Sequence, residues 1–322
     1  MNRFGFFLLG VVLSGCGKTC TEPASTEPVT NDVTSSATNQ GAQPNPWEPE
    51  RKSNLIPTII DDLNPLKWEF DDKSSSGSSS KTITSSGGRK YHIVSTLGRG
   101  AQGEVYLARQ EPGSVMVALK RTDPGAPLEA ELAALRAVKG KHGFNQLLEE
   151  FSVGKDRYLA LGRLGPTIQD IKLKTGGKLS LRMIGSIALQ MIDRMEALHD
   201  IGYVHLDFFP NNLVVGMGSE KNQLFVIDFG QARPLTASGR RFDVMSVSHS
   251  VLRLLGSRGF GSPQHIGSTR LEVVCEGLPA PVLEMFIYSH RTLARDEKPD
   301  YDKFRSIVRK LVPDYDGSLR LF

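Results

Sequence analysis

Three polar side chains suited to binding a metal ion or moving a proton occur in the stretch 205–230. Asp207 and Asn212 lie on either side of a proline, which disfavours a helix and indicates a loop. Asp228 follows the apolar run 224–227, which predicts a buried strand. Two carboxylates and an amide offer only oxygen ligands, and Mg²⁺ takes such ligands together with substrate phosphates. The stretch therefore predicts a magnesium site with a base beside it.

A glycine-rich segment precedes this stretch and lies between two runs that read as strands. Gly98, Gly100 and Gly103 follow the run 91–97, and a second strand-like run starts at Val105. The same glycine spacing occurs in dinucleotide-binding turns, but a helix follows the glycines there, whereas β-branched and aromatic residues continue a hairpin here. Glycines let backbone N–H groups approach phosphate oxygens closely. We therefore expect a loop that covers nucleotide phosphates.

A lysine at the end of the next predicted strand, 115–120, could direct a positive charge at the same phosphates. The helix that follows can open at a proline and repeats four apolar residues on one face: Leu128, Leu132, Leu135 and Val138. Glu131 lies at the edge of that face and should point inward. We expect it to pair with Lys120, with Glu129 as the weaker alternative.

The segments after this helix should position the loop that carries Asp207. Another strand is expected at 157–161. Ser180 can cap a long helix whose apolar residues recur on one face and which leads directly into the loop. Two further helices are expected at 279–293 and 299–312. The chain thus reads as a strand-rich part followed by a helix-rich part.

The order H-x-D-x-x-x-x-N followed by D-F-G, at 205–212 and 228–230, resembles the catalytic and metal-binding loops of protein kinases. The segment 161–167 resembles the interlobe hinge of the casein kinase 1 and vaccinia-related kinase group. The segment 127–132 is also similar to that group. The motifs occur in the order that the kinase family has.

The resemblance covers about residues 89–312 and implies an α+β fold of two lobes. The β-rich N-lobe would occupy 89–164 and the mainly helical C-lobe 165–322. The implied activity is transfer of the γ-phosphate of ATP to a hydroxyl group. By the same resemblance, the acceptor would be Ser or Thr on a protein, or a small hydroxyl-bearing molecule.

The resemblance also implies a role for each candidate residue. Asp207 corresponds to the base that orients the accepting hydroxyl, and Asn212 and Asp228 correspond to ligands of Mg²⁺. Lys120 corresponds to the phosphate clamp that Glu131 holds in place. The nucleotide would lie against the glycine loop and the apolar residues around the hinge, namely Gly98, Gly100, Gly103, Val105, Ala118, Leu161 and Leu164. The implied cofactors are ATP and Mg²⁺.

Two positions and one connection depart from the kinase pattern. Leu206 replaces the usual arginine before the catalytic aspartate, and Phe209 replaces the usual lysine two residues after it. Losing one preorganised charge of that kind can cost on the order of 10² in rate, so we expect slow chemistry or a substitute cation. The connection from Gly230 to Asp243 is also far shorter than an ordinary activation segment, the bed for a peptide substrate. Asp243 itself resembles the aspartate that braces the catalytic loop.

The N-terminus resembles an export signal. Arg3 precedes the apolar run 4–13, which is too short to span a bilayer as a helix and is typical of a signal peptide occupying 1–15. The small residues before Cys16 resemble a bacterial lipobox, in which Cys16 would be lipidated. A eukaryotic secretory signal cut near the same place is the alternative. Either way we expect an exported protein, secreted or membrane-anchored through Cys16.

Residues 16–88 are rich in Ser, Thr and Pro and should form a disordered linker, because they cannot bury enough apolar surface to offset their ordering entropy. An apolar cluster at 55–70 could dock on the folded domain. The net charge of +4 is too small, and the basic residues too dispersed, to indicate nucleic-acid binding. Only Cys275 falls in the expected domain, so no disulfide framework is expected there.

Three classes of function remain open on the sequence. The first is a kinase-like enzyme, and the second is a nucleotide-binding pseudokinase that scaffolds partners. The third is an exported protein whose domain binds a partner without nucleotide. The presence of all four metal and phosphate positions favours the enzyme, because a scaffold could lose them. Because a bacterial periplasm is expected to lack ATP, a true lipobox would favour the binding classes.

Overall fold

A computed structural model describes residues 81–100, 103–122, 128–256, 277–294 and 296–321. All of them belong to one compact unit of the chain, Asn45–Phe322. The expected signal peptide with Cys16, the linker up to residue 80 and the segment 55–70 lie outside the described residues. Among the helices that are described, none is both long enough and apolar enough to cross a membrane.

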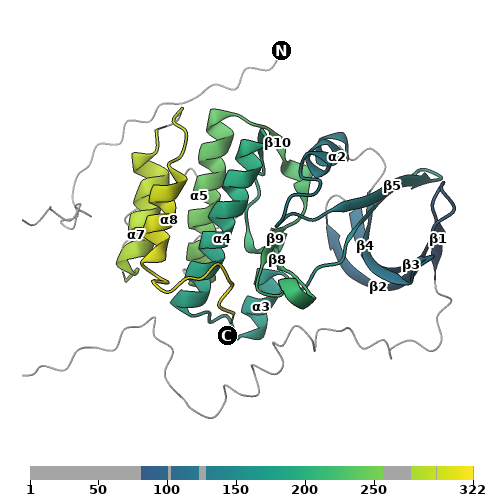
Figure 1. Cartoon of the computed structure of the whole chain (residues 1–322), viewed down its shortest axis with the longest axis horizontal. Coiled ribbons are helices and arrows are strands. Elements are labelled where there is room, and N and C mark those ends of the chain that lie inside the picture. The colour runs from purple at the N-terminus through teal and green to yellow at the C-terminus, as the bar shows by residue number, and fades with distance from the viewer. Residues whose placement is uncertain (1–80, 101–102, 123–127, 257–276, 295, 322) are drawn as a thin grey trace, which may run out of the picture. The chain divides into compact units, whose positions relative to one another are not determined.

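Six antiparallel strands form a curled sheet in the order β1-β2-β3-β4-β6-β5 (Figure 1). Their bounds are β1 Thr82–Thr84, β2 Lys90–Gly100, β3 Gly103–Glu111, β4 Val115–Thr122, β5 Leu147–Val153 and β6 Asp156–Gly162. The curl brings side chains of distant strands into contact. Tyr91 of β2 stacks on Phe151 of β5, although these strands are not neighbours in the sheet. Phe151 stacks in turn on Tyr158, with 5.3 Å between ring centroids.

The sheet begins earlier than the sequence predicted. Thr82–Thr84 pair with Lys90–His92 of β2, so the linker that was expected to reach residue 88 ends before residue 82. Ile83 explains the difference, because it is 7% exposed and packs into the core of the sheet. A three-residue strand is too short to leave a periodic pattern in a Ser- and Thr-rich segment.

Helix α2, Leu128–Ala137, stands between β4 and β5 in the chain. The predicted apolar face is confirmed, since Leu128, Leu132 and Leu135 are all buried. These residues belong to a core that continues through Leu159 and Leu161 of β6 into the helices of the C-terminal part. The helix therefore belongs to the packing of both parts of the domain.

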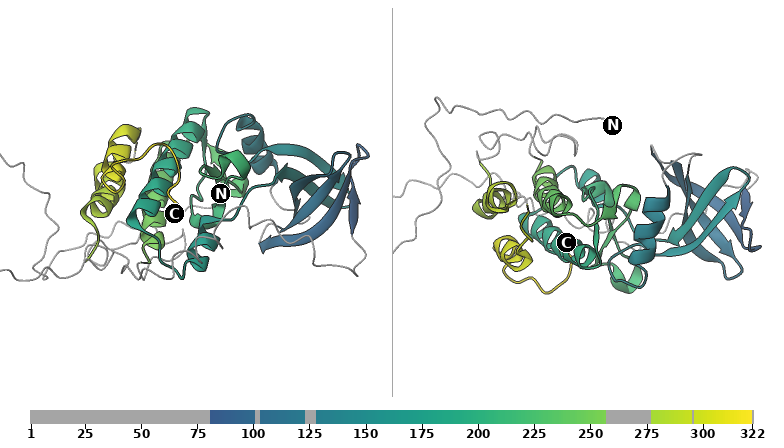
Figure 2. Two further views of the ribbon diagram at one scale, coloured as in Figure 1. Left: turned by 60° about the horizontal axis from the view of Figure 1, so that its bottom comes forward. Right: turned by 90° about the horizontal axis from the view of Figure 1, so that it is seen from above.

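The C-terminal part is mainly helical (Figures 1 and 2). Its helices are α3 Ile168–Lys174, α4 Leu181–Asp200, α5 Ala237–Leu254, α7 Ala280–Ile287 with the π-helical turn Tyr288–Thr292, and α8 Tyr301–Arg309. Two short two-stranded antiparallel sheets lie between α4 and α5 in the chain: β7 Tyr203–Val204 with β10 Arg233–Pro234, and β8 Leu213–Val215 with β9 Leu224–Val226. The helices α4 and α5 pack against each other, while α7 and α8 cover them on the side away from the sheet.

The helix starts follow the sequence closely. The hydroxyl of Ser180 accepts from the Met183 amide at 3.2 Å, which confirms the predicted cap of α4. The predicted apolar face of α4 is buried, but burial extends further, because all residues from Met183 to Ile192 are buried and only the C-terminal half is buried on one face. The single helix expected at 279–293 ends as an α-helix at Ile287 and continues as a π-helical turn.

We expect Phe304→Ala to destabilise the domain by about 3–5 kcal/mol, because Phe304 of α8 is fully buried and removal of its ring leaves a cavity. Leu173→Ala is the matched control, since Leu173 is 67% exposed on α3. Urea denaturation of both variants measures the change in unfolding free energy. Equal effects of the two substitutions would contradict the packing described here.

Candidate active site

One lysine links the sheet to α2 and to the loop after β9. The Nζ of Lys120, two residues before the end of β4, lies 2.7 Å from Oε1 of Glu131 and 3.1 Å from Oδ1 of Asp228. The predicted pair of Lys120 with Glu131 is thus confirmed, and Glu129 instead pairs with Arg157. Burial alone would lower the pKa of Lys120, but the charges of Glu131 and Asp228 raise it above its usual value. The amine therefore stays protonated beside two carboxylates.

The loop after β7 holds two further candidates together. Asn212 donates from Nδ2 to Oδ2 of Asp207 at 2.6 Å and to the Asp207 carbonyl at 3.1 Å. The proline that was expected to keep this loop non-helical instead opens a single 3₁₀ turn, Pro210–Asn212, whose first position needs no N–H donor. That turn brings Asn212 back over Asp207 and leaves the amide oxygen of Asn212 free of the Asp207 hydrogen bonds.

A buried carboxylate of α5 holds the loop that carries Asp207 through hydrogen bonds to its backbone. Asp243 of α5 is fully buried, and its two oxygens accept from the backbone N–H groups of His205 at 2.8 Å and Leu206 at 2.7 Å. Leu206 has a positive φ of 63°, a conformation that costs energy for a residue with a branched side chain. Asp243 also pairs with Nε2 of His199 at 3.0 Å, and Nδ1 of His199 meets the Tyr301 hydroxyl. The expected bracing by Asp243 is confirmed.

Buried aromatic rings connect the loop to the sheet side of the site. His205 contacts Phe208 and Phe229, with ring centroids 4.9 Å and 5.2 Å away, and Phe229 contacts Phe144 at 6.3 Å. Phe229 follows Asp228, whose φ of 59° turns the two side chains in different directions. As a result Phe229 packs into the core while the carboxylate of Asp228, 42% exposed, faces Lys120.

The strand register places the expected nucleotide-contacting residues on one face. Val105 pairs with Lys120 across β3 and β4, and Ala118 pairs with Leu161 across β4 and β6. Because residues opposite each other share a face, and positions two apart along a strand do too, these four side chains lie on the same side of the sheet. Leu164 is half-buried in the connection between β6 and α3.

The three glycines of the glycine-rich segment differ in whether the fold itself requires a glycine at that position. Gly103 has a φ of 132°, and a Cβ there would lie 1.9 Å from the carbonyl oxygen of Arg121, so the hairpin itself requires glycine. Gly98 and Gly100 are exposed, and a Cβ at either would meet nothing within 4 Å. Packing within the described residues therefore does not require glycine at these two positions.

The donors at the site suit magnesium bound together with phosphates. Asp228 and Asn212 offer oxygen atoms, the ligands that Mg²⁺ prefers. Among the described residues, no three His, Cys, Asp or Glu side chains gather closely enough to hold a metal by themselves. Mg²⁺ typically takes one or two carboxylates and completes its shell with phosphate oxygens and water, so the residues present fit that ion.

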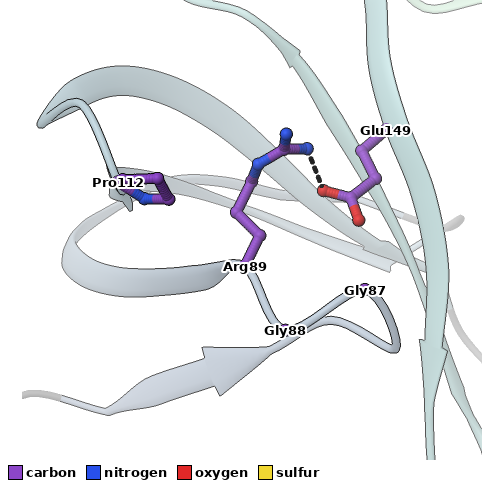
Figure 3. A pocket seen from close by; sticks show the side chains of 5 residues that line it. All are labelled: Gly87, Gly88, Arg89, Pro112 and Glu149. Carbon is purple, nitrogen blue, oxygen red and sulfur yellow. Dashed lines mark hydrogen bonds and ion pairs between the residues drawn. The ribbon is translucent and has the colours of Figure 1, made fainter.

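A separate surface pocket lies away from these residues (Figure 3). It is lined by Gly87, Gly88, Arg89, Pro112 and Glu149. Arg89 donates to Oε2 of Glu149 at 2.7 Å, and the Tyr91 hydroxyl donates to the same oxygen at 2.6 Å. With its charges already paired and none of the predicted site residues in its lining, this pocket is a structural feature of the sheet.

The carboxyl of Asp207 is partly withdrawn from water. Burial raises the pKa of Asp207 above its usual value, against the opposing effects of His205 and of the hydrogen bond from Asn212. Burial likewise lowers the pKa of His205, so this ring stays neutral in the core. A carboxyl with a raised pKa is a better proton acceptor once ionised.

We expect Asp207→Asn to stabilise the nucleotide-free protein at neutral pH. Because the pKa of Asp207 is raised on folding, its stabilising effect is complete below the unfolded pKa of about 3.9 and is lost as pH rises through the folded pKa. Asparagine does not suffer that loss. Thermal denaturation at pH 7 should show a higher midpoint for the variant, and the difference should shrink toward zero below about pH 3.9. Asp296→Asn, at an exposed aspartate, is the control; a less stable Asp207→Asn variant at pH 7 would contradict the sign.

The model of the protein kinase domain family matches residues 91–275, which is more than half of the chain. The matched range contains the curled sheet from Tyr91 of β2 onward, α2, the loop of Asp207 and the Asp228 turn, and leaves out β1. The sheet and the helical part correspond to the N-lobe and the C-lobe of the two-lobed α+β fold of that family. The chain therefore belongs to the protein kinase domain family, whose general activity is phosphoryl transfer from a nucleotide.

Proposed function

We propose that this protein is an ATP-dependent phosphotransferase that moves the γ-phosphate of Mg-ATP to a hydroxyl group. One observation carries the proposal: Lys120 binds both Glu131 and Asp228, and the residue before Asp228, Ile227, donates its backbone N–H at 2.9 Å to the carbonyl of Asn212, on the loop on which Asn212 and Asp207 are hydrogen-bonded together. A merely structural domain has no need to gather an amine, three acids and an amide at the edge of an open glycine hairpin.

Each residue has a distinct part in the proposed reaction. Lys120, oriented by Glu131, binds phosphate oxygens of the nucleotide, and Asp207 orients the acceptor hydroxyl and accepts its proton. A bond forms between the acceptor oxygen and the γ-phosphorus, while the bond from that phosphorus to the bridging oxygen breaks and ADP leaves. Asn212 and Asp228 would hold Mg²⁺, which supplies charge neutralisation at the phosphates when bound.

The acceptor is proposed to be a Ser or Thr hydroxyl of a protein, or a small hydroxyl-bearing molecule, and not a nucleic acid. The resemblance to the casein kinase 1 and vaccinia-related kinase group supports the protein acceptor. The chain from Gly230 reaches α5 already at Ala237, with Thr236 as its cap. So short a connection leaves little surface on which a peptide substrate could lie. Its shortness therefore favours an unusual acceptor. In kinases with a long activation segment, an arginine at the position of Leu206 binds a phosphate on that segment. The short connection leaves no such segment, which fits the loss of the arginine.

One observation favours the alternative of a nucleotide-binding pseudokinase. Phe209 occupies the position of the usual catalytic lysine and is only 3% exposed, so this position offers no charge to the transferring phosphoryl. A domain of this kind could bind Mg-ATP and act as a scaffold with little or no transfer. The two functions share the nucleotide and differ in the chemical step.

The test is Mg²⁺-dependent transfer of labelled γ-phosphate to casein, to small alcohols and to the protein itself. We expect Asp207→Asn to lower the rate by on the order of 10²–10⁴, because it removes the proton acceptor. We expect Lys120→Met to lower it by on the order of 10², because it removes a preorganised charge. The controls are Asp296→Asn and Lys310→Met, since Asp296 and the ion-paired Lys310 are exposed and distant from the site.

Nucleotide binding separates the outcomes. Calorimetric binding of Mg-ATP without transfer, unchanged by Asp207→Asn, would favour the pseudokinase. Absence of any Mg-ATP binding by the full chain would contradict both functions and leave a domain that binds a partner without nucleotide.

We also propose that the protein is exported and is secreted or anchored to a membrane through Cys16. This proposal depends only on the sequence of the N-terminus. Mass spectrometry of the mature protein should find an N-terminus at or near residue 16, with acyl chains on Cys16 if the lipobox is used. An intact N-terminal Met1 would contradict export by this route.

A further inference from the structure

The side chain that replaces the usual catalytic lysine is turned toward α5. Phe209 packs against Met245 and Phe242 of α5 in a small hydrophobic cluster. The neighbouring carbonyl of Phe208 accepts from the Ser250 hydroxyl of the same helix at 2.6 Å. This part of the loop is therefore anchored to α5 by packing, and its own side chain cannot reach the phosphates.

An arginine from the same helix lies over the ring of that phenylalanine. Arg253, in the last turn of α5, places the centre of its guanidinium 5.4 Å from the centroid of the Phe209 ring. This distance is within the range of a cation–π contact, which an arginine makes through its planar face. Arg253 is half-buried, and within the described part of the chain no carboxylate forms an ion pair with its guanidinium.

The charge of Arg253 acts on the groups around the loop. It opposes the effect of burial on the pKa of Asp207, and it adds to the effect of burial in lowering the pKa of Lys172 and of His249. The position of the guanidinium follows from its contact with Phe209, which lies two residues after Asp207 in the same loop. The Lys172 amine of α3 donates to the backbone carbonyl of Arg253, which fixes the end of α5 beside the loop.

Two other described cations near the site, Lys120 and Arg233, already have hydrogen-bond or ion-pair partners. Lys120 is held by Glu131 and Asp228. Arg233 donates from Nη1 to the carbonyl oxygens of Gly230 and Ala232. Arg253 thus combines a position over Phe209 with a guanidinium that no described carboxylate neutralises.

We propose that Arg253 supplies the positive charge that Phe209 cannot, and that it binds the γ-phosphate of the nucleotide during transfer. The inference rests on the proposed function, and it moves the cation from the catalytic loop to the end of α5. Phe209 then serves as the platform that holds the guanidinium near Asp207. An arginine suits this task because its fork of donors matches phosphate oxygens and its face stacks on a ring.

The experiment compares Arg253→Met, Arg253→Lys and the control Arg309→Met by calorimetry with Mg-ATP and with Mg-ADP. Arg309 is a matched control because it lies 5.7 Å over the ring of Tyr315, far from the site on α8. We expect Arg253→Met to lose about 10-fold of the preference for Mg-ATP over Mg-ADP, since only the former carries the γ-phosphate. The rate of transfer should fall by on the order of 10². Arg253→Lys should keep part of both, and Arg309→Met should change neither.

A second substitution tests whether a cation on the catalytic loop can replace Arg253. Phe209→Lys in the Arg253→Met protein returns a cation to the catalytic loop and should restore part of the ATP preference. An unchanged ratio of Mg-ATP to Mg-ADP affinity in Arg253→Met would overturn the inference while the proposed function stood. A rise confined to the KM of the acceptor would also overturn it, because Arg253 would then bind the acceptor. Failure of wild type to bind either nucleotide would refute the proposed function and this inference together.

Discussion

The buried carboxylate of Asp243 is the constraint on which the rest of the site depends. It accepts from the backbone amides of His205 and Leu206 and pairs with His199, so one side chain fixes α4, α5 and the loop between them. A fully buried charge is tolerated only when hydrogen bonds surround it, as they do here. The same bonds hold Leu206 at its unfavourable positive φ and thereby aim Asp207 away from the core.

A second constraint joins the two lobes through polar groups. Lys120 lies on a strand of the sheet, Glu131 on α2, and Asp228 after a short strand of the C-lobe, yet both carboxylates lie within 3.1 Å of the Lys120 amine. Beneath them the rings of His205, Phe229 and Phe144 form a continuous apolar support. The polar groups are thus held in place by a core that does not itself take part in chemistry.

In the loop that carries Asp207, a phenylalanine replaces the usual lysine, and helix α5 places an arginine over its ring. Phe209 gives up the charge of the usual lysine and gains burial against α5, which strengthens the anchoring of the loop. The contact with Arg253 brings a charge back from α5 to the same place.

Local sequence determined much of this protein: the order of the motifs, the apolar face of α2 and the cap at Ser180 all follow from periodicity and residue type. The pairing of Lys120 with Glu131 was predictable because helical spacing alone turns Glu131 inward. Tertiary structure alone decided the strand Thr82–Thr84, the link from Asp243 through His199 to Tyr301, and the position of Arg253 over Phe209. The last two contacts join residues far apart in the chain and depend on how the helices pack, for which no local pattern exists, and the strand is too short to leave a periodic pattern.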